Sequence, residues 1–221
     1  MNLLWIAAGI AGFSLLDRAL THIRLEGVYY AVHTVHNAAI VYLTAPEVVH
    51  TLTRFKELET FPTNMAAINL CYALHFYHCL LYWRKFRFDD WLHHGLMIAV
   101  ALPIGTFLET HTLTGVSLFF TTGLPGGIDY ALLFGVRNGW VGRMTEKSVN
   151  RALNVWIRSP GCAAHAALTF AYLLPYAAWN VQSVLGSVAP LLVYWNGQYF
   201  MGQVVADYAR LTNGGVGTPS L

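Results

Sequence analysis

The stretch Phe88-Asp89-Asp90-Trp91-Leu92-His93-His94-Gly95-Leu96-Met97 places two acids and two adjacent histidines at the start of a long apolar run. Arg84, Lys85 and Arg87 stand just before it, and no Lys or Arg follows until Arg137. Basic residues at one end of an apolar segment are typical of a membrane helix that starts on the cytoplasmic side. Ionisable side chains inside hydrocarbon are costly and mark functional sites, so we expect this segment to carry one.

The composition of the whole chain supports this interpretation. Of its 221 residues 56% are hydrophobic and only 11% are charged, which is typical of an integral membrane protein. The formal net charge of +2 is too small to indicate nucleic-acid binding. Cys71, Cys79 and Cys162 lie in separate apolar runs without a CxxC spacing, so they indicate buried thiols and neither a disulfide framework nor a metal site.

The apolar runs predict an all-α, polytopic membrane protein with about seven transmembrane helices. The expected spans cover residues 3–16, 27–45, 65–83, 91–107, 113–136, 162–179 and 184–205. The second span is expected to end before Pro46, and Gly123-Leu124-Pro125-Gly126-Gly127 is expected to kink or unwind the fifth. Pro175 is expected to interrupt the sixth span and Pro190 the seventh.

Three units follow from this pattern. Residues 1–25 form a first membrane helix and loop, residues 26–211 form the main transmembrane domain, and the Gly-rich residues 212–221 form a flexible tail. Within the domain, residues 143–158 combine an apolar stripe with charged residues, which predicts an amphipathic helix on the membrane interface that ends at Pro160-Gly161.

The basic residues predict the orientation. With loops placed alternately on the two sides, every Lys and Arg except Arg54 and Lys56 falls on one face. The positive-inside rule then puts the C-terminus on the cytoplasmic or equivalent side of the endoplasmic reticulum or another organelle membrane, and the N-terminus on the opposite side.

Polar groups from five of these helices converge in one layer. At a rise of ~1.5 Å per residue, the layer lies roughly 4–15 Å from the basic face. It contains His33, His36, His75, His78, His93, His94, His165 and Asp129, with Asn37 beside the first pair. We expect a polar chamber in which His93, His94 and Asp129 are catalytic and the others contact substrate. The alternative is that these histidines only bridge helices through hydrogen bonds.

Asp89 and Asp90 have two possible roles at the start of the fourth span. Acids in a first helical turn are suited to capping the helix. Each also precedes a histidine by four residues, so Asp89 could pair with His93 and Asp90 with His94. A neutral imidazole held by a carboxylate is a usual general base.

The His93-His94 pair, the acids and aromatics before it, and Asp129 one helix later together resemble the TLC-domain superfamily, which includes the ceramide synthases. The resemblance covers about residues 27–207. It implies a barrel of six helices around a central cavity with one further helix outside. It also implies acyl transfer from acyl-CoA as cosubstrate, with His93 and His94 matching the family's histidine pair and Asp129 one of its acids. The chain departs from ceramide synthases at Met97, where they carry Thr, and in lacking a second acid near Asp129.

Three functions remain open from the residues. The first is a lipid-metabolising enzyme that transfers an acyl group to the amine or hydroxyl of a long-chain lipid, with His93 or His94 as base. The second is a non-catalytic lipid-binding or accessory subunit that contacts other membrane proteins. The third is a di-iron or haem protein with paired histidines as ligands, although His75-Phe76-Tyr77-His78 lacks the HxxHH pattern of membrane hydroxylases.

Overall fold

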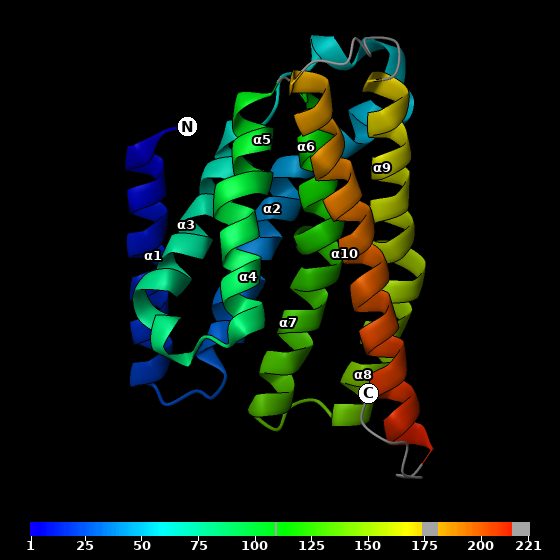
Figure 1. Ribbon diagram of the computed structural model, residues 1–221. Coiled ribbons are helices and arrows are strands. Elements are labelled where there is room, and N and C mark those ends of the chain that lie inside the picture. Colours follow the sequence, from blue (N-terminus) through cyan, green and yellow to red (C-terminus); the bar gives the residue numbers. More distant parts are fainter. Residues whose placement is uncertain (109, 174–180, 214–221) are drawn as a thin grey trace.

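In the computed structural model, which describes residues 1–108, 110–173 and 181–213, every regular element is helical (Figure 1). The all-α prediction is therefore confirmed for the described chain. The α-helices are α1 (Leu3–His22), α2 (Val28–Thr53), α3 (Met65–Tyr82), α4 (Phe88–Leu96), α5 (Leu102–Phe107), α6 (Thr112–Leu118), α7 (Leu124–Arg137), α8 (Arg143–Leu153), α9 (Ser159–Leu173) and α10 (Val181–Thr212). Short 3-10 turns, η1 (Phe55–Thr60) and η2 (Trp83–Lys85), come after α2 and α3.

Three pairs of these helices are joined by π-helical turns into continuous rods. The turns are η3 (Met97–Ala101) between α4 and α5, η4 (Phe119–Gly123) between α6 and α7, and η5 (Asn154–Arg158) between α8 and α9. Each turn ends two residues before a proline, namely Pro103, Pro125 and Pro160. A proline donates no hydrogen bond, and its ring crowds the carbonyl one turn earlier, so a wider turn at that place lets the helix continue.

Several sequence expectations about helix ends are therefore wrong. The Gly123–Gly127 stretch does not unwind, because the wider π-helical turn η4 accommodates Pro125 without ending the helix. Pro160-Gly161 does not end a helix, because η5 does the same for the α8–α9 rod. Helix α2 continues through Pro46 to Thr53, and α10 continues through Pro190 to Thr212. Pro175 and the tail residues 214–221 lie outside the described residues, and Thr212 belongs to α10.

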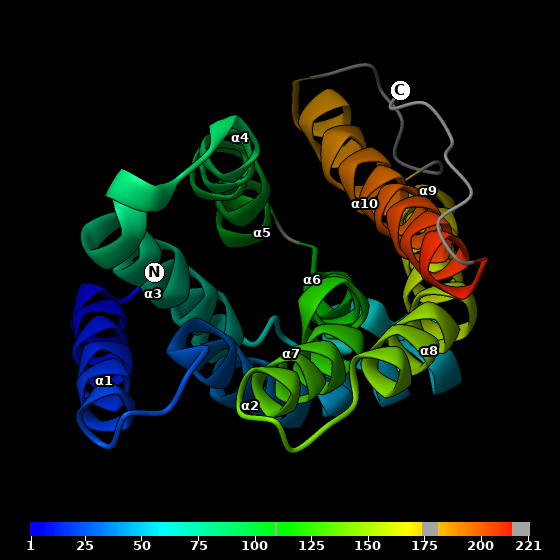
Figure 2. The same cartoon turned by 90° about the horizontal axis from the view of Figure 1, so that it is seen from below.

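The rods form a closed ring of neighbours, seen end-on in Figure 2. Helix α2 packs against α3, α3 against α5, α5 against α10, and α10 against α9. The α8–α9 rod packs against the α6–α7 rod, which returns to α2. Helix α1 lies outside this ring and contacts α3 and α2.

Polar contacts fix α1 to the outside of the ring. Asp17 accepts hydrogen bonds from the hydroxyls of Tyr77 and Tyr82, both near the end of α3. The backbone N–H of Asn2 donates to Oδ1 of Asn69 over 3.1 Å. Phe13 is buried between these two contacts, so both ends of α1 are held to α3.

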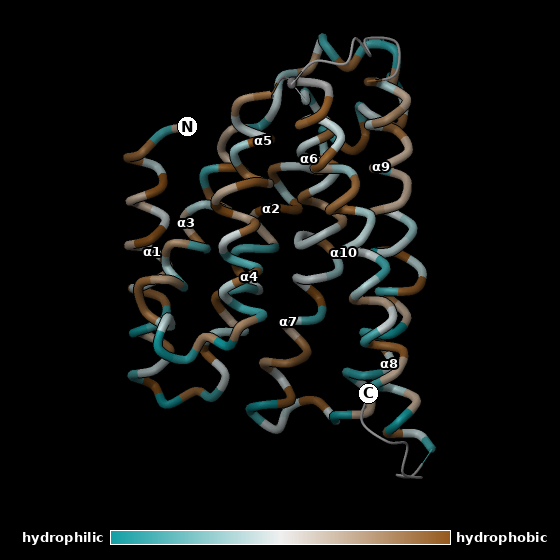
Figure 3. Tube along the Cα trace, viewed as in Figure 1, coloured by the Kyte–Doolittle hydropathy of each residue, from teal (hydrophilic) through white to brown (hydrophobic). Residues whose placement is uncertain are grey.

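Apolar and polar residues share the interior, while large apolar residues cover the outside. Asn37 is fully buried and Glu47 and Glu146 are almost so, whereas Tyr42 is 81% exposed and Trp156 is 77% exposed. Figure 3 shows hydrophobic residues along the length of the rods, with hydrophilic ones at the connections of both ends and at places within the rods. When the helices of the described ranges are considered singly, one of them, α1, is long and apolar enough to cross a bilayer.

Candidate functional site

Five histidines from three helices form one cluster near the lower end of the ring. The ring of His33 on α2 stacks on His78 of α3 with centroids 4.6 Å apart. His94 on α4 lies 5.4 Å from His78 and 5.2 Å from His75, and His93 lies 5.4 Å from His75. The i, i+3 spacing brings His75 and His78 to one face of α3, as the sequence predicts. We call His33, His75, His78, His93 and His94 the histidine cluster.

The histidine cluster contains ring nitrogens without partners. Nδ1 of His75 donates to the carbonyl of Cys71 over 2.8 Å, so in the neutral ring Nε2 carries the free lone pair. That Nε2 has no hydrogen-bond partner, and neither has Nε2 of His78 or Nδ1 of His94. Four of the five rings are buried, and His93 alone within the cluster is exposed. Unpaired ring nitrogens next to one accessible imidazole suit proton transfer.

Aromatic side chains wall this cluster, a role that no sequence pattern indicated. Tyr29 and Tyr130 pack on His33 with centroids 4.1 Å and 4.3 Å away. Phe86 stacks on His94 at 4.6 Å with the two planes 10° apart. These rings hold the imidazoles in fixed orientations and exclude water from all but the exposed edge.

The other expected substrate contacts lie apart from these ring contacts. His36 bonds to Oδ1 of Asn37 over 2.8 Å and packs its ring against Phe13, toward α1. Oδ1 of Asn37 also accepts from Thr122. His165 bonds to Thr169 on its own helix, α9. Five of the seven histidines are therefore joined by ring contacts, while His36 interacts with them electrostatically and His165 bonds within α9.

The acids at the start of α4 are not hydrogen-bonded to the histidines, and Asp90 interacts with His93 and His94 through its charge alone. Asp90 accepts a 2.9 Å hydrogen bond from the backbone N–H of Arg87, so it caps α4. Asp89 is exposed, and no hydrogen bond joins either acid to His93 or His94 in the described chain. Asp129 has Arg158 as the strongest opposing charge acting on it.

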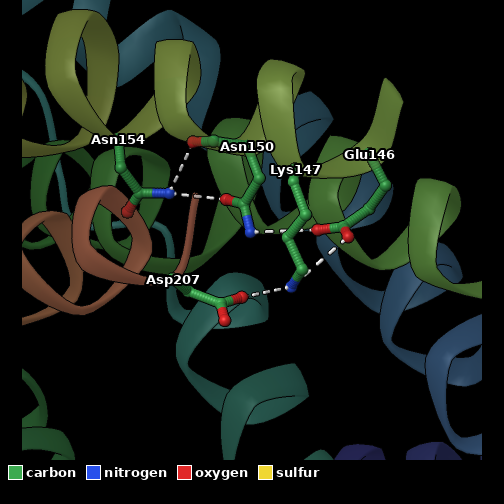
Figure 4. Close-up of polar contacts among 5 residues, drawn as sticks. All are labelled: Glu146, Lys147, Asn150, Asn154 and Asp207. Carbon is green, nitrogen blue, oxygen red and sulfur yellow. Dashed lines mark hydrogen bonds and ion pairs between the residues drawn. The ribbon is translucent and has the colours of Figure 1, made fainter. Parts of the chain in front are cut away.

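A second polar array, which we call the polar ladder, runs along the α8–α9 rod, and Figure 4 shows it from Glu146 to Asn154. Its members recur every four residues on one face: Glu146, Asn150, Asn154 and Arg158. Nδ2 of Asn150 donates to Glu146, Nδ2 of Asn154 donates to Oδ1 of Asn150, and Nη1 of Arg158 donates to Oδ1 of Asn154, over 3.4, 2.6 and 3.2 Å. Each of these side chains is therefore hydrogen-bonded to the next one along the same helix face.

The polar ladder lies on the segment expected to form an interfacial helix. Its polar face is turned into the ring, where Glu146 is 1% and Arg158 8% exposed, while Trp156 points outward. Leu153 is buried as well, so the apolar residues of 143–158 are divided between the interior and the outside. Arg158 therefore does not belong with the basic residues at the lower end, and the sequence pattern did not indicate that this polar face is buried.

Lys147 closes the lower end of the polar ladder. Its Nζ lies 2.9 Å from Asp207 of α10 and 3.4 Å from Glu146 (Figure 4). Glu146 is buried, whereas Asp207 is half-exposed, so the cation balances one carboxylate inside the ring and one at its edge. Lys147 therefore links α8 to α10.

Lys147→Met is expected to destabilise the protein by about 1–3 kcal/mol, because it leaves the buried Glu146 carboxylate with one long hydrogen bond. Asp207→Asn is the matched control: Asp207 is half-exposed, so its loss should cost less than about 1 kcal/mol. Unfolding of each variant in detergent, followed by circular dichroism, measures the difference. Equal losses of stability in the two variants would show that Lys147 stabilises the protein only through its ion pair with Asp207.

The hypothesis of a metal ion held by several side chains finds no donor set in the described residues. Within the described residues, no three His, Cys, Asp or Glu side chains are placed to hold one metal ion. The histidine cluster is joined by ring faces and edges, whereas ligands to one ion direct their nitrogens at a common point.

Comparison with protein-family models, with curated proteins and with solved structures gives no match to this chain.

Proposed function

We propose that this chain is a polytopic membrane protein of the TLC type that transfers an acyl group to a long-chain lipid. The ring of six rods with α1 outside supports the family assignment. The observation that carries the function is the histidine cluster, with one exposed imidazole backed by buried rings that have unpaired nitrogens.

Two features support the membrane part of the proposal. Each rod is about 18 residues or longer once the π-helical turns are counted, enough for a hydrocarbon core of ~30 Å. The connections after α1, α3 and α7 and the end of α10 lie together at one end, and with the helix ends beside them they carry most of the basic residues. Segment η1, with Lys56, lies at the other end.

A labelling experiment tests this orientation. Lys85→Cys and Lys56→Cys are made separately in sealed vesicles, with the native cysteines replaced by Ala, and exposed to a membrane-impermeant maleimide. We expect only one variant to react before the vesicles are opened, and Lys85→Cys to be the one facing the cytoplasmic side. Reaction of both variants, or of neither, in sealed vesicles would contradict the proposed spans.

The proposed reaction uses His93 as general base. The imidazole takes the proton from a lipid hydroxyl or amine as its oxygen or nitrogen bonds to the thioester carbon of acyl-CoA. The C–S bond breaks, and the departing thiolate receives that proton from His93 and leaves as the free thiol. His93 is chosen over His94 because it is the accessible member of the cluster, whereas His94 is buried against Phe86 and positions the group.

The activity test uses the full chain in liposomes with radiolabelled palmitoyl-CoA and a panel of long-chain alcohols and amines. We expect a labelled ester or amide and an equal amount of free CoA thiol. Thioester hydrolysis without acceptor-dependent product would contradict acyl transfer. Lipid binding with no turnover would favour the non-catalytic lipid-binding function instead.

A further inference from the structure

Three unsatisfied polar groups meet where α2, α7 and η5 approach each other. Nε of Arg158, Nδ2 of Asn37 and Oδ1 of Asp129 are buried, and none has a hydrogen-bond partner. Arg158 is 8% exposed and Asn37 is fully buried. An unpaired polar group in the interior costs about 1–3 kcal/mol, so three at one place indicate a missing ligand.

Gly126 places these groups around one point. A Cβ on Gly126 would lie 2.9 Å from Nδ2 of Asn37 and 3.5 Å from Nη2 of Arg158, so the Asn37 amide and the Arg158 guanidinium both approach this glycine closely. Asp129 lies one turn later on α7 and interacts electrostatically with Arg158. The absence of a side chain at Gly126 lets the two donor groups approach the helix that carries the acceptor.

The neighbours of Arg158 leave its Nε available for such a ligand. Its Nη1 is used by Asn154 of the polar ladder, and its guanidinium lies 5.3 Å from the centroid of the Phe200 ring on α10. These contacts fix the guanidinium plane while Nε stays unpaired. Oδ1 of Asn37 is likewise held by His36 and Thr122, which directs Nδ2 toward Gly126.

We infer that Arg158, Asn37 and Asp129 form a subsite that binds the uncharged hydroxyl end of a long-chain lipid. A hydroxyl oxygen accepts from Arg158 or Asn37, and its proton is donated to Asp129. The cation and the carboxylate cancel in net charge, so an anionic or cationic headgroup would lose its hydration without net attraction. This inference rests on the proposed function and narrows the acyl acceptor from alcohols and amines to alcohols.

Native mass spectrometry of the detergent-purified full chain tests the subsite. An equimolar mixture of hexadecan-1-ol, hexadecylamine and hexadecyl phosphate is added, and the bound ratio is measured. The tails are identical, and the same mixture serves every variant, so partitioning into micelles cancels between variants. We expect the alcohol to be bound at least about tenfold more than either charged lipid, which corresponds to about 1.4 kcal/mol.

Charge substitutions should reverse this preference in opposite directions. Asp129→Asn is expected to raise the phosphate-to-alcohol ratio about tenfold or more, and Arg158→Gln to raise the amine-to-alcohol ratio equally. Asp89→Asn and Arg151→Gln, which change the same charges at exposed positions, are the controls and should leave both ratios unchanged. Size-exclusion chromatography checks the fold of each variant.

The outcomes separate the subsite from the proposed function. A wild-type ratio that does not favour the alcohol would overturn the subsite, whatever the variants do. Unchanged ratios in both folded variants would also overturn it, even if palmitoyl transfer is observed. Conversely, alcohol binding that reverses as expected, without any transfer, would support the subsite and contradict the acyl-transfer function.

Discussion

His93→Ala is expected to lower the rate of acyl transfer by about 10²–10⁴-fold, the usual contribution of a positioned general base. His93 is the exposed ring of the histidine cluster, and its contact with His75 holds it in place. Removing the imidazole leaves the buried rings with no accessible base to receive the acceptor's proton. Initial rates with labelled palmitoyl-CoA at saturating acceptor measure the loss.

Two controls distinguish chemistry from structure at this position. His22→Ala removes a histidine at the exposed end of α1 and should leave the rate unchanged. Added imidazole should restore part of the rate of His93→Ala, because a cavity replaces the side chain, but it should not restore His93→Gln equally. A folded His93→Ala protein with near wild-type turnover would rule out His93 as the base.

The sequence predicted the helices well because their apolar runs are long, but it could not predict the course of the backbone at three prolines. Pro103, Pro125 and Pro160 each signal a break from local rules. Whether a helix breaks or widens by a π-helical turn depends on neighbouring rods that support the backbone. The breaks expected at Pro125 and Pro160 are therefore continuous rods in the folded chain.

The site was predicted only in part, because local sequence rules describe side chains within one helix and not the packing between helices. The i, i+3 pair His75 and His78 and the adjacent His93 and His94 lie together because spacing within a helix fixes direction. Which helix Asp129 faces depends on rotation of the α6–α7 rod, and local periodicity carries no information on it. The polar ladder was missed because a buried polar face and an exposed one have the same periodicity.

Asp129→Leu is expected to destabilise the protein by about 3 kcal/mol, close to the cost of leaving a buried charge without its opposing partner. Arg158 is almost fully buried, and the Asp129 carboxylate is the strongest opposing charge acting on it. Leucine has a similar volume but offers no charge and no acceptor. The guanidinium would then keep Asn154 and the face of Phe200 as its main stabilising contacts.

A second substitution, Arg158→Met, shows whether this loss arises from the unbalanced charge. In the double variant Asp129→Leu/Arg158→Met no buried charge is left unpaired, so much of the stability lost in Asp129→Leu should return. Unfolding by sodium dodecyl sulfate in mixed micelles gives the four free energies of the cycle. Additive losses of stability would show that Asp129 and Arg158 do not interact. The balance of charge between them, on which the expected selectivity for an alcohol rests, would then be contradicted as well.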